Sequence, residues 1–418
     1  MIMERYDLIV VGGGFSGFGA AVSASRAGLK VLLVEKSNCL GGAGAGALVT
    51  PFMPTVTELN GEKTELCRGI FLEIREELER QNGISYGSFD TEKLKLILNR
   101  ISTEAGVDIL FHATLIDAKI KDGVVSSVTL ATVEGNINIE ADYFIDATGD
   151  AQLSYLLSLP YQLGREGDSL CQPMTLSFRL GGVSKDEFYS SLDSLQIEYK
   201  LAQARGEISN PRENILVFNT TRDDVLHFNT TRVVKKNPTS AREKSEAEII
   251  AREQVFELYD FMKKHGRGLE KSYVLQTGSE IGVRESRKII GEYVLTGKDE
   301  VECTKFDDSI AVSNYDIDIH NPEGSGTSHH YFKKGEYFTI PYRALIPRGT
   351  KNILAVGRCI SCDHEAQASI RIMPIVTCIG EAGGTAIAQA HREKKATMDI
   401  DIRALQNELI KNGAFIGI

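Results

Sequence analysis

The chain begins with an apolar run that leads directly into a glycine-rich turn and then into a segment with many alanines (residues 7–24). In a strand–turn–helix of this kind, Gly12 permits the tight turn, Gly14 lets a pyrophosphate approach the backbone, and Gly17 lets the helix pack close to the sheet. A second apolar run ends at Glu35, whose carboxylate can accept hydrogen bonds from both ribose hydroxyls of an adenosine. This order of parts predicts dinucleotide binding, whereas the glycines alone fit any α/β protein.

Two later apolar runs also end in small, polar turns, at residues 143–150 and 352–358. The ribityl chain and ring of a flavin extend well past the pyrophosphate, so a FAD site needs such distant segments, whereas a plain NAD dehydrogenase does not. The Gly41-Gly42 pair adds a place where the backbone can pass close to a ligand. These features favour FAD over NAD.

With these motifs the sequence resembles the FAD-dependent oxidoreductases of the glutathione-reductase-like superfamily, near the flavoproteins of the fumarate reductase and heterodisulfide reductase types. The resemblance spans nearly the whole chain, and most members have no assigned substrate. It is carried by residues 12–17, 41–42, 147–150, 172–175, 282–287 and 357–361. It implies that FAD is held at Gly12, Gly14, Phe15, Ser16, Gly17, Glu35, Lys36, Gly41, Gly42, Thr114, Thr148, Gly149, Asp150, Gly357, Arg358, Ile372 and Met373.

The chain is therefore expected to be an α/β protein in which a Rossmann-like FAD-binding domain is interrupted by an inserted α+β domain. The FAD-binding domain is predicted to combine a parallel sheet, helices and a small antiparallel meander over residues 1–150 and 341–395. Residues 151–340 are predicted to form the substrate or cap domain, and residues 396–418 a C-terminal helix and tail. Ligands bind in the crevice between such parts.

Hydrophobic spacing predicts several local elements. A helix is expected over residues 91–104, an antiparallel meander over 110–139 and a half-buried strand over 174–180. Two similar segments, 218–222 and 228–232, predict a hairpin rather than a repeat architecture, because nothing else recurs at that period.

Charge narrows the choice of partners. The formal net charge is −10, and no block rich in lysine or arginine offsets it, so we expect no nucleic-acid partner and no RNA-modifying activity. No apolar run is long enough to cross a bilayer, and no basic and apolar leader precedes the first strand. We therefore expect a cytoplasmic protein without membrane contact.

The seven cysteines are scattered, which argues against a disulfide framework and against an iron–sulfur cluster. Only Cys359 and Cys362 are close in sequence. As a redox pair beside the flavin they would make the protein a disulfide reductase, which needs an accessible thiol in an electropositive setting. We favour a packing role, because the resembling family usually has a small residue without sulfur in the place of Cys362.

Candidate catalytic residues lie near the C-terminal end. Pro374 is expected to be the first residue of a helix, and the resemblance implies that the N-terminus of this helix faces the pyrimidine edge of the flavin. Just upstream, His364 is predicted to remove or supply a proton, and Arg371 to bind an anionic or carbonyl oxygen of the substrate. The alternatives are that Arg371 pairs with Glu365 or holds the flavin, and that His364 is a hydrogen-bonded loop residue.

Further arginines are candidates for substrate binding. Arg284 and Arg287 could form a second anion clamp, since a guanidinium fork matches a carboxylate, although an ion-pair cluster with the intervening glutamate is the favoured interpretation. Arg343 is a weaker candidate. His320 and residues 329–330, both histidines, flank a stretch rich in glycine and serine that predicts a mobile loop and a lid. No metal site is expected there, because adjacent side chains seldom face one ion.

Together these features predict an enzyme that moves a hydride between a small polar molecule, bearing a hydroxyl or carboxylate group, and N5 of FAD. No second glycine fingerprint follows another apolar strand, so electrons must come from the substrate, a separate small molecule or a partner protein. The alternative is a flavin-containing electron-transfer subunit of a larger reductase complex. A homo-oligomer is compatible with either function.

Overall fold

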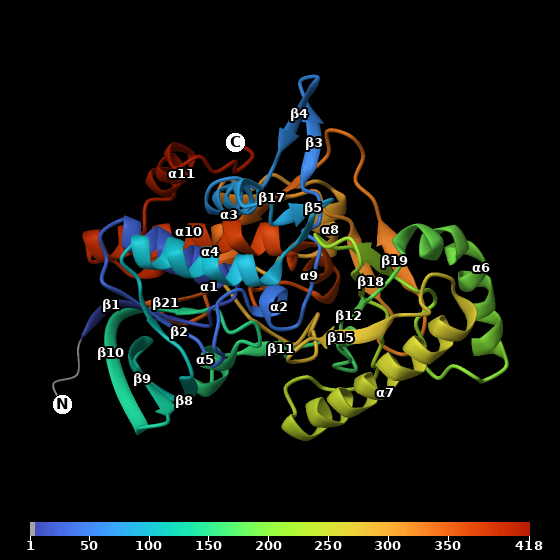
Figure 1. The fold of residues 1–418 in the computed structure, drawn as a ribbon. Coiled ribbons are helices and arrows are strands. Elements are labelled where there is room, and N and C mark those ends of the chain that lie inside the picture. The colour runs from blue at the N-terminus through green and yellow to red at the C-terminus, as the bar shows by residue number, and fades with distance from the viewer. Residues whose placement is uncertain (1–4) are drawn as a thin grey trace.

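The computed structural model describes residues 5–418, and its main sheet carries the first glycine-rich turn (Figure 1). The central strand β1 pairs in parallel with β2 and β10, and β10 also pairs in parallel with β21. The order is β7-β2-β1-β10-β9-β8, with β21 beside β10. These strands are β1 (Tyr6–Val11), β2 (Val31–Val34), β7 (Asp108–Leu110), β8 (Thr114–Lys121), β9 (Val124–Thr132), β10 (Gly135–Asp146) and β21 (Ile353–Ala355). The α/β prediction and the meander of β8, β9 and β10 are confirmed.

Both faces of β1 are buried, which explains why its sequence is continuously apolar. Leu8 and Val10 pack with the helices α1 (Phe15–Arg26), α3 (Ile70–Arg80), α4 (Thr91–Glu104) and α10 (Met373–Glu393). Ile9 and Val11 face the opposite side and pack with the meander. The sheet therefore holds the glycine-rich turn between two hydrophobic cores, and α4 confirms the helix predicted over residues 91–104.

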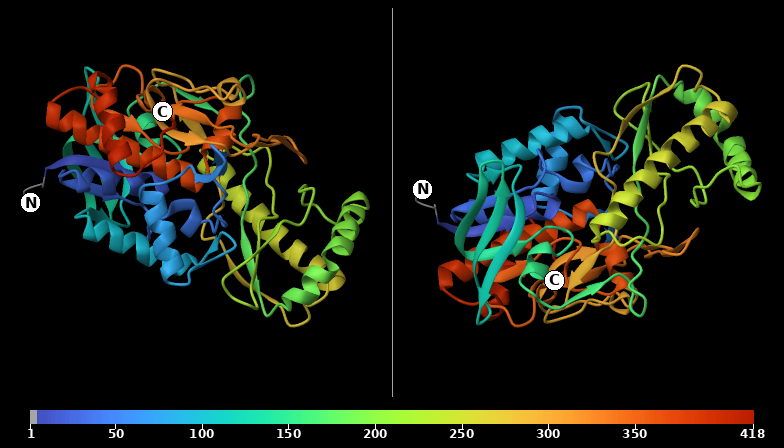
Figure 2. Two further views of the ribbon diagram at one scale, coloured as in Figure 1. Left: turned by 90° about the horizontal axis from the view of Figure 1, so that it is seen from above. Right: turned by 90° about the horizontal axis from the view of Figure 1, so that it is seen from below.

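Helices α1 and α10 lie side by side (Figures 1 and 2), and glycines permit their close approach. A Cβ atom on Gly380 would lie 2.0 Å from the carbonyl oxygen of Ser16, and one on Gly384 would lie 2.1 Å from that of Ala20. Both atoms are backbone, so neither contact could be relieved by a side-chain rotation. The small residues of α10 therefore set the distance between this helix and the glycine-rich turn.

Glu381 of α10 is a buried carboxyl group at the start of α3. It is 4% exposed and accepts a hydrogen bond of 3.0 Å from the backbone N–H of Ile70. Burial raises the pKa of Glu381 to about 7, although the hydrogen bond from Ile70 and the charge of Arg26 oppose this shift. An N–H group without an intrahelical partner is satisfied in this way.

Replacing Glu381 with Gln should raise the melting temperature at pH 8 and have little effect at pH 5. The folded protein holds this proton more tightly than the unfolded chain, so folding stability is lost as the pH rises through about 7. The loss for a shift of this size is on the order of 3 kcal/mol when fully expressed. Thermal melts of Glu381→Gln at both pH values test this, with the exposed Glu76→Gln on α3 as the control. An equal difference at both pH values would contradict the expectation.

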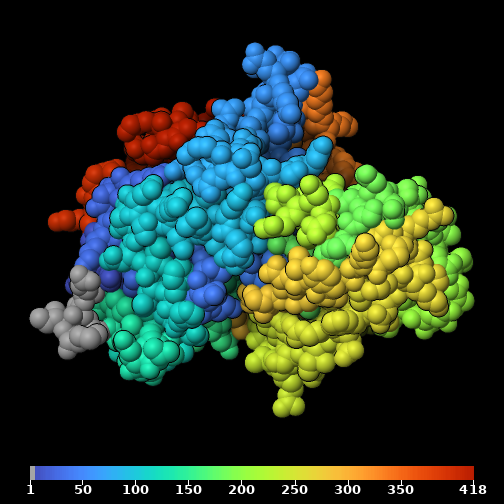
Figure 3. Space-filling model, viewed as in Figure 1, coloured from blue at the N-terminus to red at the C-terminus, as the bar shows by residue number. Residues whose placement is uncertain are grey.

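The inserted part forms a separate lobe with its own core, beside the N-terminal helices (Figures 1 and 3). Its sheet has the order β13-β14-β12-β15, covered by two long helices. These elements are β12 (Phe178–Gly181), β13 (Val217–Asn219), β14 (Leu226–Phe228), β15 (Tyr273–Thr277), α6 (Lys185–Ala204) and α7 (Ala241–His265). The hairpin predicted over residues 218–232 is confirmed as β13 and β14. Only 178–180 of the predicted strand 174–180 is regular strand, although its apolar residues are buried as expected.

The remaining elements are short. They are α2 (Gly42–Ala45), β3 (Val56–Leu59), β4 (Glu62–Glu65), β5 (Ile84–Ser85), β6 (Ser88–Phe89), α5 (Gln152–Leu156), β11 (Tyr161–Leu163), β16 (Arg287–Ile289), α8 (Gly297–Val301), β17 (Ser309–Ser313), β18 (Ile317–His320), β19 (Thr327–His330), β20 (Phe338–Pro341), η1 (Tyr342–Leu345), α9 (His364–Ile370), η2 (Thr397–Asp399) and α11 (Ile402–Lys411). Ile310 of β17 and Ile340 of β20 share the core of α1 and α10.

Two local features differ in detail from the prediction. The histidines predicted to flank a mobile loop lie on β18 and β19, which pair with each other, because the glycine- and serine-rich stretch forms only the turn between them. Pro374 is the second helical residue of α10 rather than the first, which is tolerated because the N–H groups of a first turn have no partner in the helix.

Among residues 5–418, no single helix is long and apolar enough to cross a membrane. Helices α9 and α10, which are bent by 95° relative to each other, would together be long and apolar enough, judged by length and composition only.

Candidate active site

The geometry of the first turn fits the roles predicted for its glycines. A Cβ atom on Gly12 would lie 2.4 Å from the carbonyl oxygen of Ala147, and one on Gly17 would lie 1.8 Å from that of Gly12. A Cβ atom on Gly14 would instead meet only the Cα atom of Gly42, at 4.0 Å. The turn is therefore closed toward the sheet and open at Gly14, where a ligand can reach the N–H groups that begin α1.

Glu35 stands at the end of β2, as predicted, and is 7% exposed. Its carboxylate accepts hydrogen bonds from the backbone N–H of Gly13, at 2.7 Å, and of Ser37, at 2.8 Å. A carboxylate has about four lone-pair sites, so these two bonds orient the group and leave acceptors for ribose hydroxyls. Thr114 lies beside this acid, since the N–H of Ala113 donates to the Glu35 carbonyl at 3.2 Å.

Two distant segments reach the same turn. Gly357 follows β21 with a φ of +88°, and a Cβ atom there would lie 2.4 Å from Oγ of Ser16. Arg358 donates through Nε to the Gly149 carbonyl at 2.7 Å and forms an ion pair with Asp150. Burial raises the pKa of Asp150, but the charge of Arg358 and the hydrogen bond from Ser286, with smaller effects of more distant lysines, together lower the net pKa. The predicted cofactor residues of the two segments therefore lock each other in place.

The loop after Glu35 completes the predicted FAD site, which we call the cofactor cradle: the first glycine-rich turn (residues 12–17), Glu35, and the segments 147–150 and 357–358. A Cβ atom on Gly44 would lie 2.9 Å from both Sδ of Met373 and a ring carbon of Phe15, so α2 meets the N-termini of α1 and α10 here. Thr148 is held by Asp146, to which its hydroxyl donates at 2.7 Å. Lys36 differs from the other predicted cofactor residues described here because its side chain is exposed. Its amino group lies 3.7 Å from the carboxylate of Glu280.

His364 is placed by a buried carboxylate that the sequence did not single out. Its Nδ1 atom lies 2.9 Å from Oε1 of Glu285, and Glu285 also accepts from Nζ of Lys288 at 2.5 Å and from the N–H of Gln172 at 3.0 Å. Glu285 and Lys288 are fully buried, and the side chain of His364 is 11% exposed. Burial alone would raise the pKa of Glu285, but the bond from His364 and the charge of Lys288 lower it, so the group is a carboxylate.

The favoured pairings of the arginine candidates are wrong. Glu285 pairs with Lys288 and His364, so it does not form the expected cluster with Arg284 and Arg287. Those two arginines have separate partners: Arg284 donates to the carbonyl of Pro173 at 2.7 Å, while Arg287 stacks 4.0 Å from the ring centre of Tyr155. They form no joint clamp, because each is engaged in a different place on the extended segment leading into β16.

Arg371 and Arg343 also have partners within the fold. Arg371 donates to the carbonyl of Asp318 at 3.2 Å and lies 3.7 Å from its carboxylate, so the predicted alternative of a Glu365 pair is wrong. Arg343 is occupied by both oxygens of Asp308, at 2.9 and 3.1 Å, and its side chain is 51% exposed. Arg343 therefore forms a surface ion pair with Asp308 and is not engaged with the cofactor cradle.

A sequence profile described as FAD dependent oxidoreductase matches residues 7–409. The chain belongs to this FAD-dependent oxidoreductase family. FAD is therefore its cofactor, in agreement with the sequence prediction. The geometry fits, because the open backbone at Gly14 and the oriented Glu35 provide a place for the pyrophosphate and a ribose.

Curated proteins match shorter stretches. Thiamine thiazole synthase of Methanococcus aeolicus is 30% identical over 162 residues, which are 36% of this chain and 58% of that protein. Digeranylgeranylglycerophospholipid reductase 2 of Methanothermobacter thermautotrophicus is 25% identical over 197 residues, 44% of this chain and 50% of that protein. The chain thus spans little more than half the length of these relatives.

Solved flavoprotein structures resemble the chain over nearly its whole length. A geranylgeranyl bacteriochlorophyll reductase-like protein of Thermoplasma acidophilum has a TM-score of 0.47 and 13% identity, over 99% of this chain and 85% of that one. A flavoprotein/dehydrogenase of Cytophaga hutchinsonii has a TM-score of 0.47 and 12% identity, over 99% and 87%.

Cys359 and Cys362 are both buried, at 0% and 3% exposure. Burial raises the pKa of each thiol. Because the thiolate is the reactive form, this environment favours a packing role for the two residues.

Reduction of the FAD-bound protein by dithionite under nitrogen should therefore end after about two electrons per flavin, whereas a redox-active disulfide would take up about two more. The titration can be followed by the visible absorbance of the flavin. The double variant Cys359→Ala/Cys362→Ala should give the same endpoint. A wild-type endpoint near four electrons that the double variant loses would establish a disulfide reductase.

Proposed function

We propose that this family member transfers a hydride between N5 of FAD and a small polar substrate that bears a hydroxyl or carboxylate group. FAD, when bound, supplies the site that accepts or returns the hydride. The observation that carries the proposal is the hydrogen bond by which Glu285 orients His364. His364 is the first residue of α9, the short helix that comes directly before α10. A histidine oriented by a carboxylate is suited to general acid–base chemistry.

The hydrogen bond to Glu285 decides which nitrogen of His364 can act. If Nδ1–H donates to the carboxylate, Nε2 keeps its lone pair, and no partner of Nε2 is found among residues 5–418. Lys288 in turn keeps Glu285 charged, so the carboxylate stabilises the imidazolium that forms when Nε2 takes a proton. His364 is therefore proposed to take the proton of a substrate hydroxyl as the hydride leaves the adjacent carbon.

Anaerobic bleaching of the flavin tests the proposal. The protein, loaded with FAD, is mixed under nitrogen with hydroxy acids, sugars and amines, and its visible absorbance is recorded. Loss of the flavin absorbance with one of them, and recovery in air, is the expected result. Bleaching by none of them, with reduction only by a protein donor, would overturn the proposal in favour of an electron-transfer role within a larger complex.

A further inference from the structure

Arginines gather where the inserted lobe meets the segment between α9 and α10. Arg212 follows α6, Arg232 follows β14, Arg284 precedes β16, and Arg371 ends α9. Contacts link two of them: Arg371 lies 3.7 Å from Asp318, Asp318 lies 3.2 Å from His320, and His320 lies 2.9 Å from Arg232. In agreement with this placement, burial lowers the pKa of Arg284 most, and the charges of Arg371, Arg212 and Arg232 lower it further. Segments far apart in the sequence thus bring four positive charges to one place.

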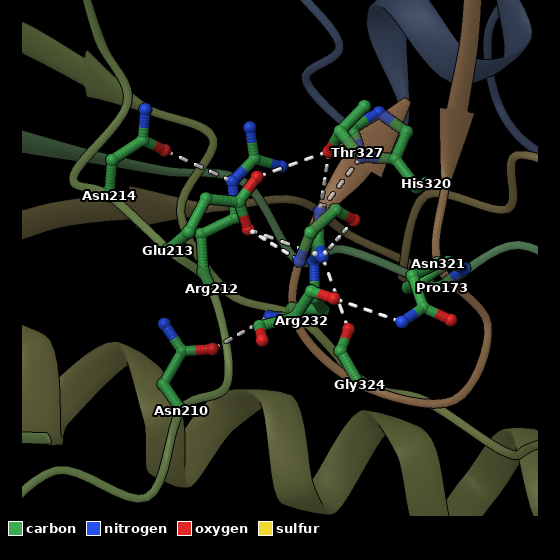
Figure 4. Close-up of polar contacts among 12 residues, drawn as sticks. Pro173, Asn210, Arg212, Glu213, Asn214, Arg232, His320, Asn321, Gly324 and Thr327 are labelled. Atoms are coloured by element: carbon green, nitrogen blue, oxygen red, sulfur yellow. Dashed lines mark hydrogen bonds and ion pairs between the residues drawn. The ribbon is translucent and has the colours of Figure 1, made fainter. Parts of the chain in front are cut away.

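Arg232 has a structural role within this cluster. Its side chain is 1% exposed and both of its terminal nitrogens are engaged (Figure 4). The partners are the Glu213 carboxylate at 3.2 Å, the carbonyls of Gly324 at 3.2 Å and Gly326 at 3.0 Å, Nδ1 of His320 at 2.9 Å, and Oγ1 of Thr327 at 3.3 Å. Arg232 therefore ties the β18–β19 hairpin to the lobe, and its terminal nitrogens are used by the protein itself.

Arg212 is different, because it is enclosed but poorly bonded. It is 6% exposed, and its one hydrogen bond runs from Nε to Oδ1 of Asn214, at 3.3 Å. Its two terminal nitrogens have no partner among the described residues and carry no dashed line in Figure 4. These two nitrogens are not fully shielded from solvent, so an acceptor that enters from solvent can reach them.

Arg284 and Arg371 also keep unused donors. Arg284 uses Nη1 for Pro173 and Thr175, both at 2.7 Å, while its Nη2 has only a long contact of 3.5 Å with Asn229. Arg371 uses Nε and Nη2 for backbone carbonyls, at 3.2 Å each, and no partner of its Nη1 is found in residues 5–418. Both residues could therefore donate to the same ligand as Arg212.

The charges of the cluster do not balance. The carboxylates that raise the pKa values of Arg212 and Arg232 are Glu213 and Asp318, which face four guanidinium groups. His320 adds no negative charge, and burial and then Arg284 lower its pKa well below the usual range, so it is neutral. Buried charges without counter-charges are costly, and a bound anion would offset that cost.

We propose that Arg212, Arg284 and Arg371 bind a small organic dianion, carrying two carboxylates or a phosphomonoester. Guanidinium groups suit both, because their paired donors match oxyanions. Arg371 is followed directly by Ile372 and α10, where FAD is expected, so the ligand would sit beside the flavin. The identification of this ligand as the substrate rests on the proposed function, whereas its binding does not.

Binding of succinate and of inorganic phosphate to the FAD-loaded protein tests the proposal by calorimetry, without turnover. One of the two anions should bind, and Arg212→Gln should weaken it at least about tenfold. Succinamide, the neutral counterpart of succinate, should not bind. Arg343→Gln is the matched control and should leave the affinity unchanged, because Arg343 is paired with Asp308 at the surface. Preference for succinate or for phosphate tells the dicarboxylate from the phosphomonoester.

Melting temperatures separate a ligand site from a structural ion pair. Without anion, Arg212→Gln should melt at or above the wild type, because an unpaired buried charge is removed. Arg232→Gln should melt lower, because it breaks bonds to the hairpin. Binding of neither anion, or wild-type affinity in Arg212→Gln, would overturn the proposal. If a dianion binds through Arg212 but no dianion bleaches the flavin, the site stands and the proposed function fails. If a compound bleaches the flavin but neither anion binds, the proposed function stands and the dianion site fails.

Discussion

Replacing His364 with Asn is expected to slow flavin reduction by the substrate about a hundredfold or more, with unchanged FAD content. The Asn side-chain amide takes the place of Nδ1 and can still donate to Glu285, but nothing replaces Nε2. The loss should therefore fall on the proton-transfer step and not on the fold. Stopped-flow measurement of flavin bleaching, with the absorbance of bound FAD as the measure of cofactor content, tests this.

Glu285 is a positioning residue in this scheme and needs its own control. The double variant Glu285→Gln/Lys288→Met removes the pair together, because loss of Glu285 alone would leave the buried Lys288 without its counter-charge. We expect kcat to fall about tenfold or more while KM changes little, since an oriented histidine matters most in the transition state.

Wild-type rates of flavin reduction in His364→Asn would refute the assignment of the proton transfer to His364.

Replacing Gly380 with Ala should expel FAD and destabilise the protein by on the order of 3 kcal/mol. The added methyl group would lie 2.0 Å from the carbonyl oxygen of Ser16, so α10 must move away from α1. Ser16 belongs to the first turn of α1, and its Oγ would lie 2.4 Å from a Cβ atom on Gly357, so the movement disturbs two parts of the cradle. Flavin absorbance after purification and thermal melts measure both effects.

Gly324→Ala is the matched control for this change. Gly324 has no heavy atom within 4 Å of its Cβ position and does not adopt a positive φ. The control should therefore keep the FAD content and the melting temperature of the wild type. Normal FAD content and stability in Gly380→Ala would show that α10 does not set the geometry of the cradle.

The cofactor cradle could be predicted from the sequence because most of the residues that shape it are close to one another in the sequence. Gly12, Gly14 and Gly17 lie within a single strand–turn–helix, and the backbone requirements of that unit are visible in residue types. The same holds for the helix at residues 91–104 and the meander, whose periodicity and turn residues identify them. The partners of the α10 glycines Gly380 and Gly384 could not be predicted, because Ser16 and Ala20 lie more than three hundred residues away in the sequence.

The candidate catalytic side was only partly predicted. His364 and Arg371 were candidates from the sequence, but the pairing of Glu285 with Lys288 and the separation of Arg284 from Arg287 were not predicted. Spacing along the chain favoured Glu285 as the partner of its arginine neighbours, whereas the fold directs it to His364. Arg212 and Arg232 had no motif at all, since an arginine in a loop looks the same whether it is solvated or enclosed.

Dinucleotide binding could be predicted from the amino-acid sequence, because the strand, the turn, the helix and the acidic residue follow one another within thirty residues. The geometry of this unit depends mainly on contacts within it. Which charged side chains are paired, and which are left with free donors, became visible only in the folded molecule. Charges act through space, and the distances that matter at Glu285, Arg212 and Asp318 are set by the docking of the inserted lobe onto α9 and α10.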